Sequence, residues 1–194
     1  MIGIAPFSIG RDTCRSYLGR MLALKDAGQT WAGDMRGARY QHNIARDPVF
    51  EALLEALRAP FSAHCGVELV PTYAFGRVYQ RGEVLHKHRD RPACEYSLTM
   101  TLGYSGDAPW PIFTSPHPGG SEATAWHILP GQALAYPGCA VWHWREPLAM
   151  DWQAQMFFHF VDANGPHAAQ KFDGRHGLAH HGCSGNCDGC PVSR

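Results

Sequence analysis

Two short segments of the chain contain residue types that could bind a metal ion. His88 and Asp90 are separated by one residue, and His143 follows 53 residues after Asp90. Two imidazoles and one carboxylate are the ligands of the 2-His-1-carboxylate facial triad, which holds non-haem Fe(II) with coordination positions open for oxygen chemistry. We therefore predict that His88, Asp90 and His143 are metal ligands and form a catalytic iron centre.

The spacing of these residues fits two β-strands. Side chains two residues apart on a strand point to the same face, so His88 should share a face with Asp90, and His143 with Arg145. One ion can bind all three ligands only if the two strands are neighbours, which the sequence does not show. The alternative is that these histidines, among twelve in the chain, are hydrogen-bonded core residues.

The first third of the chain has helical periodicity. We predict one helix capped by Asp12 and ended near Gly28, and a second with Asp47 as cap, Pro48 in its first turn and Pro60 at its end. The apolar residues recur at helical spacing on one side of each segment: Cys14, Tyr17, Leu18, Met21 and Leu22 in the first, and Phe50, Leu53, Leu54 and Leu57 in the second.

From residue 68 onward the pattern changes to short aromatic and β-branched runs separated by glycine and proline. This rhythm is typical of antiparallel strands in a sandwich or barrel, here with helices packed on one side. The expected class is α+β, mainly β. We predict seven strands, at residues 73–79, 95–104, 110–114, 124–129, 132–136, 141–145 and 153–161.

Composition narrows the classes of partner and compartment. The 194 residues are enough for one domain with a sizeable core. The formal net charge is zero, so we expect neither nucleic acid nor membrane as a partner, and the oligomeric state stays open. The odd number of cysteines, seven, and the lack of a secretory signal or apolar span favour a reducing cytoplasm.

The last part of the chain differs from the rest in composition. Residues 166–194 are rich in Gly, His and Cys, and we expect a loosely packed tail after a single domain at residues 1–165. Within it, Cys183, Cys187 and Cys190 have a spacing that could bind Zn or an Fe–S cluster as a second metal site. We favour the alternative of a flexible, redox-sensitive tail.

Two ordered motifs resemble one protein family. The segment Tyr79-x-x-Gly82-x-x-Leu85-x-x-His88-x-Asp90, and the later Pro130–Gly138 stretch that leads to His143, resemble the prolyl 4-hydroxylase-like 2-oxoglutarate/Fe(II) oxygenases over residues 73–165. The resemblance implies a double-stranded β-helix (jelly-roll, cupin-like) core at residues 67–165 supported by helices in residues 1–66. It also implies Fe(II) and 2-oxoglutarate as cofactors, with ascorbate (vitamin C) as an additional candidate.

The chain departs from the family at the residue that binds the cosubstrate. The family supplies a Lys or Arg for the far carboxylate of 2-oxoglutarate after the distal histidine, but that neighbourhood here contains Gln153 and Gln155. Between residues 92 and 170 the only Lys or Arg is Arg145. We predict Arg145 as the anchor, with Arg77 as second choice and Tyr79, matching the family tyrosine, as a hydrogen-bond donor. In the alternative, Arg145 pairs with Glu146 or Glu95 at the surface.

Three functions remain open from the sequence. The first is a 2-oxoglutarate-dependent hydroxylase of a peptidyl residue or small metabolite, releasing succinate and CO2, with proline as substrate only by resemblance. The second is a non-oxidative cupin-like metal protein, an isomerase or a metal sensor. The third is a metal- or redox-sensing interaction module that works through its Cys/His tail. Loss of function on truncation after residue 165, but not in His88→Ala, would indicate the third.

Overall fold

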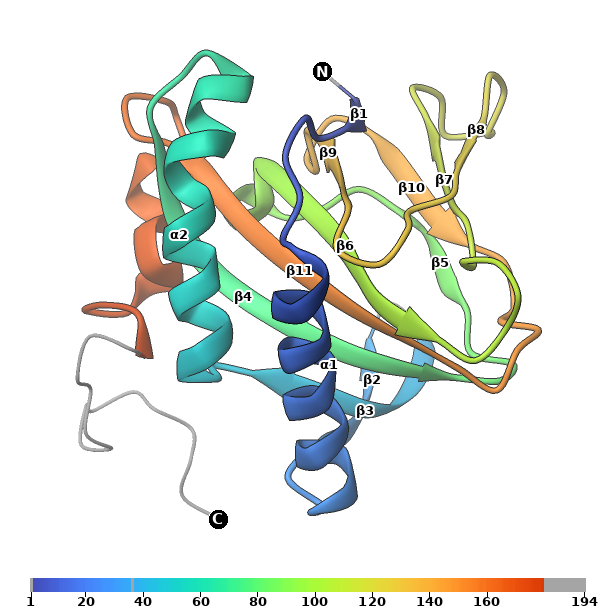
Figure 1. Cartoon of the computed structure of the whole chain (residues 1–194). Coiled ribbons are helices and arrows are strands. Elements are labelled where there is room, and N and C mark those ends of the chain that lie inside the picture. The colour runs from blue at the N-terminus through green and yellow to red at the C-terminus, as the bar shows by residue number, and fades with distance from the viewer. Residues whose placement is uncertain (1, 36, 180–194) are drawn as a thin grey trace.

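The computed structural model describes residues 2–35 and 37–179, which form two antiparallel sheets and two α-helices (Figure 1). The seven-stranded sheet has the order β1-β9-β6-β11-β4-β3-β2, and the four-stranded sheet has the order β5-β10-β7-β8. The large sheet comprises β1 (Gly3–Ile4), β2 (Trp31–Met35), β3 (Ala38–Ala45), β4 (Leu69–Gln80), β6 (Tyr96–Tyr104), β9 (Ala133–Tyr136) and β11 (Trp152–Asp162). The small sheet comprises β5 (Leu85–His88), β7 (Ile112–Ser115), β8 (Thr124–Trp126) and β10 (Trp142–Arg145). The helices are α1 (Arg11–Asp26) and α2 (Pro48–Cys65), with short 3-10 helices η1 (Pro92–Cys94) and η2 (Ala168–Gly174).

The chain alternates between the two sheets after α2. It passes through β4 in the large sheet, β5 in the small one, β6 in the large one, then β7 and β8, β9, β10 and finally β11. This alternation is consistent with a jelly roll. The predicted mainly β class with two antiparallel sheets is confirmed, and each of the seven predicted strands is present with shifted ends.

The helices cover one face of the large sheet, as predicted (Figure 1). Alternate residues of the central strands point toward them and form the main hydrophobic core, to which the helices add Met21 and Leu54, both 0% exposed. The strand residues in this core include Leu98, Met100, Met156, Phe158 and Phe160. The residues of opposite parity face the space between the sheets, and many are buried and polar: Ser97, Thr99, Thr101, Gln153, Gln155 and His159.

The start of α1 differs from the prediction. The N-cap is Gly10, not Asp12, and no side chain caps the helix by a hydrogen bond. Asp12 lies inside the first turn, where its carboxylate is 97% exposed and pairs with Arg15 at 3.7 Å. A negative charge there favours the helix through its dipole rather than through a cap. Gly28, with φ of +68°, follows the helix end as predicted.

The second helix confirms the predicted cap but not the predicted end. The Asp47 carboxylate accepts hydrogen bonds from the backbone N–H groups of Val49 and Phe50 at 3.0 and 3.1 Å. Pro60 lies inside the helix, which runs to Cys65. A proline removes one helical hydrogen bond. The next residue, Phe61, is 1% exposed and packs edge-on against Phe160, and this packing stabilises the helix beyond the proline.

The β2–β3 hairpin is absent from the predicted strands. β3 pairs with β4, placing Asn43 opposite Arg77, so the hairpin extends the large sheet past β4. Trp31 and Met35 of β2 are 44% and 36% exposed, and β2 has no buried residue. A strand without a buried face lacks the alternation by which strands are predicted.

Residues 166–179 pack more closely than predicted. The Arg175 guanidinium binds both carboxylate oxygens of Glu51 at 2.7 and 3.1 Å, and Leu178 is 0% exposed. These contacts join η2 and the residues after it to α2 and β4. The predicted metal site at Cys183, Cys187 and Cys190 lies outside the described residues. In the part of the chain that is described, no helix is both long and apolar enough to cross a membrane.

We expect Glu51→Ala to lower the free energy of unfolding by about 3 kcal/mol, because Arg175 would be left as a largely buried cation without its partner. Glu55→Ala on the same helix is the control. Glu55 pairs with Arg58 at 2.7 Å, but both side chains are partly exposed, so a loss below about 1 kcal/mol is expected. Urea denaturation followed by circular dichroism measures both, and equal losses would contradict the role of the buried pair.

Candidate metal centre and its cavity

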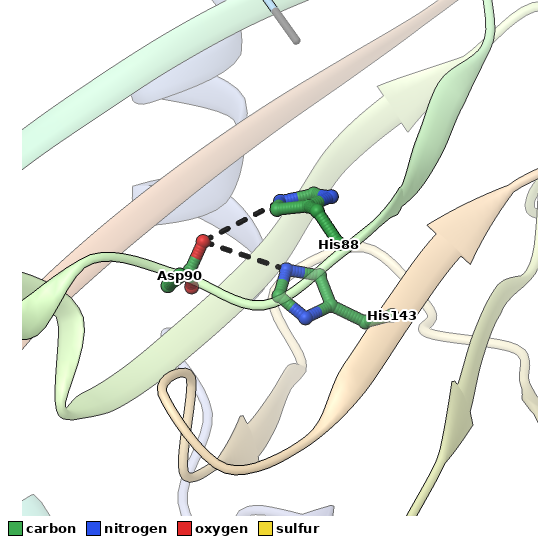
Figure 2. A group of neighbouring side chains, drawn as sticks. All are labelled: His88, Asp90 and His143. Atoms are coloured by element: carbon green, nitrogen blue, oxygen red, sulfur yellow. Dashed lines mark ion pairs between the residues drawn. The ribbon is translucent and has the colours of Figure 1, made fainter. Parts of the chain in front are cut away.

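The three predicted metal ligands lie together between the sheets (Figure 2). β5 and β10 are antiparallel neighbours in the small sheet, with His88 opposite His143. The Nε2 atoms of His88 and His143 lie 3.4 and 3.6 Å from Oδ1 of Asp90. The donor atoms of the three residues all lie within 4.8 Å of one another. A single ion could therefore contact two nitrogens and one oxygen from one side.

Asp90 is positioned by the loop after β5. The strand ends at His88, and the Asp90 backbone N–H donates to the Gly138 carbonyl at 2.9 Å. A β-carbon on Gly138 would lie 2.6 Å from Oδ2 of Asp90, so only glycine fits at this close approach. Burial raises the pKa of Asp90, but the hydrogen bond from His88 and the nearby His143 outweigh it and the net pKa is lowered. The carboxylate is thus ionised at neutral pH.

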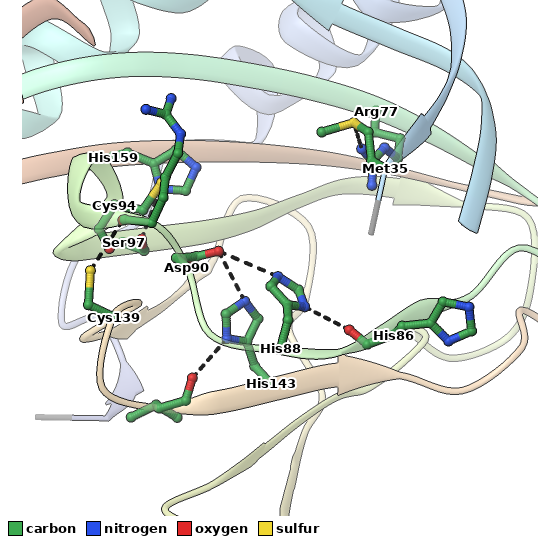
Figure 3. A network of polar contacts seen from close by, with 12 residues as sticks. Met35, Arg77, His86, His88, Asp90, Cys94, Ser97, Cys139, His143 and His159 are labelled. Carbon is green, nitrogen blue, oxygen red and sulfur yellow. Dashed lines mark hydrogen bonds and ion pairs between the residues drawn. The ribbon is translucent and has the colours of Figure 1, made fainter. Parts of the chain in front are cut away.

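Backbone carbonyls hold both imidazole rings in the orientation that a metal requires. Nδ1 of His88 lies 2.7 Å from the His86 carbonyl oxygen, and Nδ1 of His143 lies 3.1 Å from that of Val141. A carbonyl only accepts hydrogen bonds, so each Nδ1 carries a proton, and in the neutral form of each ring Nε2 has the lone pair that a metal would use. These carbonyls are outer partners of the kind that usually orient metal-binding histidines. Figure 3 shows the His86 ring turned away from the triad.

A cavity of about 560 Å³ adjoins the triad. Its walls include His88, Asp90 and His143, together with several aromatic side chains: Trp31, Tyr40, Tyr73, Phe75, Tyr136 and Phe157. Four arginines also line it, namely Arg46, Arg77, Arg91 and Arg175. The cavity therefore combines a largely apolar wall with positive charge.

A second group of potential ligands adjoins the first and includes two residues that the sequence analysis missed. Asp90, Cys94 and His159 have donor atoms within 4.8 Å of one another (Figure 3). Burial lowers the pKa of His159 to about 4 and raises that of the Cys94 thiol. Metals bind the thiolate, which burial disfavours here, so the donor set of His88, Asp90 and His143 suits a ferrous ion better. The one available signal for His159 was its inward parity on β11.

Arg145 points into the protein and not toward its surface. It is 0% exposed, and Nη1 donates to the Trp110 carbonyl, while Nε and Nη2 have no hydrogen-bond partner among the described residues. Burial lowers the pKa of Arg145 to about 10, so the side chain still carries its charge at neutral pH. No ion pair joins it to Glu146 or Glu95 in the described chain, so the alternative of a surface ion pair is wrong.

Gln153 and Gln155, the glutamines found where a cation was expected, form hydrogen bonds to neutral groups. Oε1 of Gln153 accepts from the Trp110 N–H at 2.8 Å, and its Nε2 donates to Gln155 at 3.1 Å. Gln155 in turn donates to Thr99 at 2.8 Å. Arg145 from the small sheet and Gln153 from the large sheet thus meet at the backbone of one residue, Trp110.

The remaining predicted residues, Arg77 and Tyr79, also face the space between the sheets. Both line the cavity, whereas Arg145 is not part of its wall. Tyr79 is 0% exposed, and its hydroxyl accepts from Nη1 of Arg77 at 3.2 Å. The Tyr79 ring packs edge-on against Trp110, with ring centres 4.9 Å apart. Tyr79 therefore lies between the cavity and the interior around Arg145.

Comparison with known proteins gives matches by structure alone. No protein-family model and no curated protein sequence matches the chain. A prolyl hydroxylase from Trichoplax adhaerens, solved with a hypoxia inducible factor peptide, matches at a TM-score of 0.67 and 13% identity, covering 83% of each chain. A Pseudomonas putida prolyl-4-hydroxylase matches at 0.60 and 13%, covering 81% of this chain and 91% of its own.

A third structure extends the range of chemistry on this fold. The non-heme alpha ketoglutarate dependent epimerase SnoN from nogalamycin biosynthesis matches at a TM-score of 0.66 and 11% identity, covering 84% of this chain and 76% of its own. The predicted resemblance to the prolyl 4-hydroxylase-like 2-oxoglutarate/Fe(II) oxygenases is thus confirmed for the fold.

We expect the metal-free protein to bind one equivalent of Co(II), a spectroscopic substitute for Fe(II). His143→Ala should weaken binding by more than the ~10–100-fold that loss of an outer-shell partner costs. Isothermal titration calorimetry measures the affinity. His86→Ala is the matched control, because its exposed side chain neighbours the triad while its carbonyl remains. An undiminished affinity in His143→Ala, together with a loss in Cys94→Ala, would place the ion at the second group.

Proposed function

We propose that this protein is a 2-oxoglutarate- and Fe(II)-dependent dioxygenase that hydroxylates a C–H bond, with release of succinate and CO2. The observation that supports it most directly is the convergence of His88, Asp90 and His143 beside a cavity. Both histidines offer Nε2 toward Asp90, and one ionised carboxylate completes the donor set. This is the ligand set used by oxygen-activating non-haem iron enzymes.

The residues present fit both cofactors. His88, Asp90 and His143 would hold Fe(II) on one side and leave the other side to 2-oxoglutarate and O2. The bound iron and cosubstrate supply the oxidising chemistry, while the chain supplies position and a water-poor interior. The Nδ1 hydrogen bonds keep both rings from rotating, so the metal would meet a preformed set of donors.

Arg145 and Tyr79 are the proposed partners of the far carboxylate of 2-oxoglutarate. Arg145 follows His143 by two residues, which places it about 7 Å further along the same face of the strand. Its two unused donor atoms are buried, and an oxyanion would satisfy them both in charge and in hydrogen bonding. The Tyr79 hydroxyl is free to donate its own proton, since it accepts from Arg77. Because Tyr79 lies between the cavity and Arg145, its side chain would have to move for the carboxylate to reach the guanidinium.

The substrate is proposed as a peptidyl residue or a small metabolite. Proline is supported by fold likeness to two prolyl hydroxylases alone, and the SnoN match shows that the same fold also serves an epimerase. Ascorbate remains a proposal without support from a described residue. The aromatic walls of the cavity would exclude water around the iron and hold an apolar part of the substrate.

We expect the anaerobic protein with Fe(II) and 2-oxoglutarate to develop a weak visible absorption band that arises from the iron–cosubstrate chelate. With O2 admitted, 2-oxoglutarate should be consumed and succinate formed in equal amounts. Asp90→Ala should lose both signals, because a ligand and its charge are removed. A wild-type protein that binds Fe(II) but gives neither band nor succinate would point to a non-oxidative metal protein instead.

Arg145→Met is expected to have two effects of opposite sign. The affinity for 2-oxoglutarate should fall by about 100-fold, the equivalent of ~3 kcal/mol for charged hydrogen bonds in a buried site. The ligand-free protein should become more resistant to heat, because a buried and largely unpaired cation is replaced by an apolar side chain. Titration of the absorption band and a thermal melt measure the two effects. Unchanged affinity for 2-oxoglutarate would contradict the assignment.

A further inference from the structure

Arg77 is a second buried cation without an acidic partner. It is 4% exposed, lies in the cavity wall, and makes no ion pair with any carboxylate of the described residues. Its hydrogen-bond partners are neutral. Nε donates to the Asn43 amide oxygen at 2.8 Å, Nη1 to the Tyr79 hydroxyl at 3.2 Å, and Nη2 to the Met35 sulfur at 3.0 Å. Figure 3 shows Arg77 beside Met35, apart from the Cys94, Ser97 and His159 group.

Aromatic rings surround this guanidinium without neutralising it. Its central carbon lies 3.5 Å from the centre of the Tyr40 ring, 5.1 Å from that of Tyr79 and 5.2 Å from that of Phe75. Contacts with ring faces offset part of the cost of burying a cation, but less than an anion does. A thioether is also a weak acceptor, so Nη2 has the poorest of the three hydrogen bonds. An incoming oxyanion would therefore gain most by replacing Met35.

Two of the other arginines in the cavity wall are already neutralised. Arg91 lies 2.6 Å from Asp173, and Arg175 lies 2.7 Å from Glu51. Arg77 differs from both in lining the same cavity with neutral partners alone. Arg77 lines the cavity, whereas Arg145 is not part of its wall, so the two guanidinium groups can serve different anions, and the proposed function assigns Arg145 to the cosubstrate. One buried cation is left for another anion.

We propose that Arg77 binds an oxyanion of the primary substrate, a carboxylate or a phosphate. The inference rests on the proposed function, in which Arg145 takes the cosubstrate. The planar fork of a guanidinium suits either group through paired hydrogen bonds. This contact makes Arg77 a determinant of substrate specificity.

The aromatic side chains near Arg77 indicate the character of the part of the substrate that does not carry the oxyanion. Trp31, Phe75 and Phe157 form a row of rings in the cavity wall, with 6.2 Å between successive ring centres. These rings offer apolar surface next to the cation, against which an apolar body of the substrate could pack. The substrate class is thus a small organic anion with an aromatic or otherwise apolar body.

The test uses full-length protein loaded anaerobically with Fe(II) and saturating 2-oxoglutarate, so that both cofactor positions are filled. Calorimetric titration compares phenylacetate and phenyl phosphate with the neutral phenylacetamide. At least one anion should bind about tenfold more tightly than the amide, as expected for charge-assisted hydrogen bonds in a buried site. Arg77→Met should abolish this preference while leaving amide binding within about twofold, and Arg77→Lys should restore part of it.

The matched control is Arg81→Met, because Arg81 comes directly after β4, the strand of Arg77, but is 63% exposed and pairs with Asp151.

Equal binding of anions and amide, or an anion preference that survives in Arg77→Met, would overturn the proposal. A larger loss of 2-oxoglutarate affinity in Arg77→Met than in Arg145→Met would overturn it too, by making Arg77 the cosubstrate anchor. Absence of the absorption band in wild type would instead reject the proposed function, and the same titrations on metal-free protein would still test Arg77.

Discussion

The pairing of β5 with β10 is the constraint on which the candidate site depends. It sets His88 opposite His143 across two neighbouring strands, and the loop after β5 then returns Asp90 to both Nε2 atoms. The same pairing turns the next inward residue of β10, Arg145, into the interior. The candidate metal-binding face and a buried positive charge are therefore consequences of one strand register. A shift of that register by one residue would send both to the opposite face of the sheet.

A second feature of the interior is buried positive charge that has no carboxylate partner among the described residues. Arg145 and Arg77 are both enclosed, and their described partners are carbonyl, amide, hydroxyl, thioether and ring groups. Such an arrangement costs stability in the free protein and is offset when an oxyanion binds. The proposed function assigns one cation to the cosubstrate, and the further inference assigns the other to the substrate. Gln153 and Gln155 of β11 form hydrogen bonds to each other, to Trp110 and to Thr99, and the two cations lie on other strands, Arg145 on β10 and Arg77 on β4.

The features that could be predicted from the sequence are those that follow from residue type and from the alternation of side chains along a strand. The sequence identified the His-x-Asp pair, the distal histidine, the inward direction of Arg145 and the strands with clear alternation. It could not show that β5 and β10 are neighbours, because that pairing joins residues far apart in the chain. β2 lacks a buried face, and β3 was not predicted as a strand although half of its residues are buried, so Met35 and Asn43, the partners of Arg77, were not foreseen. Pro60 inside α2 shows packing overriding a local signal.

The most direct test of the central claim is a crystal structure of the protein with Mn(II), an oxygen-inert substitute for Fe(II), and 2-oxoglutarate, with the metal located by anomalous scattering. The account predicts a single metal peak bounded by Nε2 of His88, Nε2 of His143 and a carboxylate oxygen of Asp90, with the far end of the cosubstrate against Arg145. A peak held by Cys94 and His159 instead, or a cosubstrate directed away from Arg145, would contradict it.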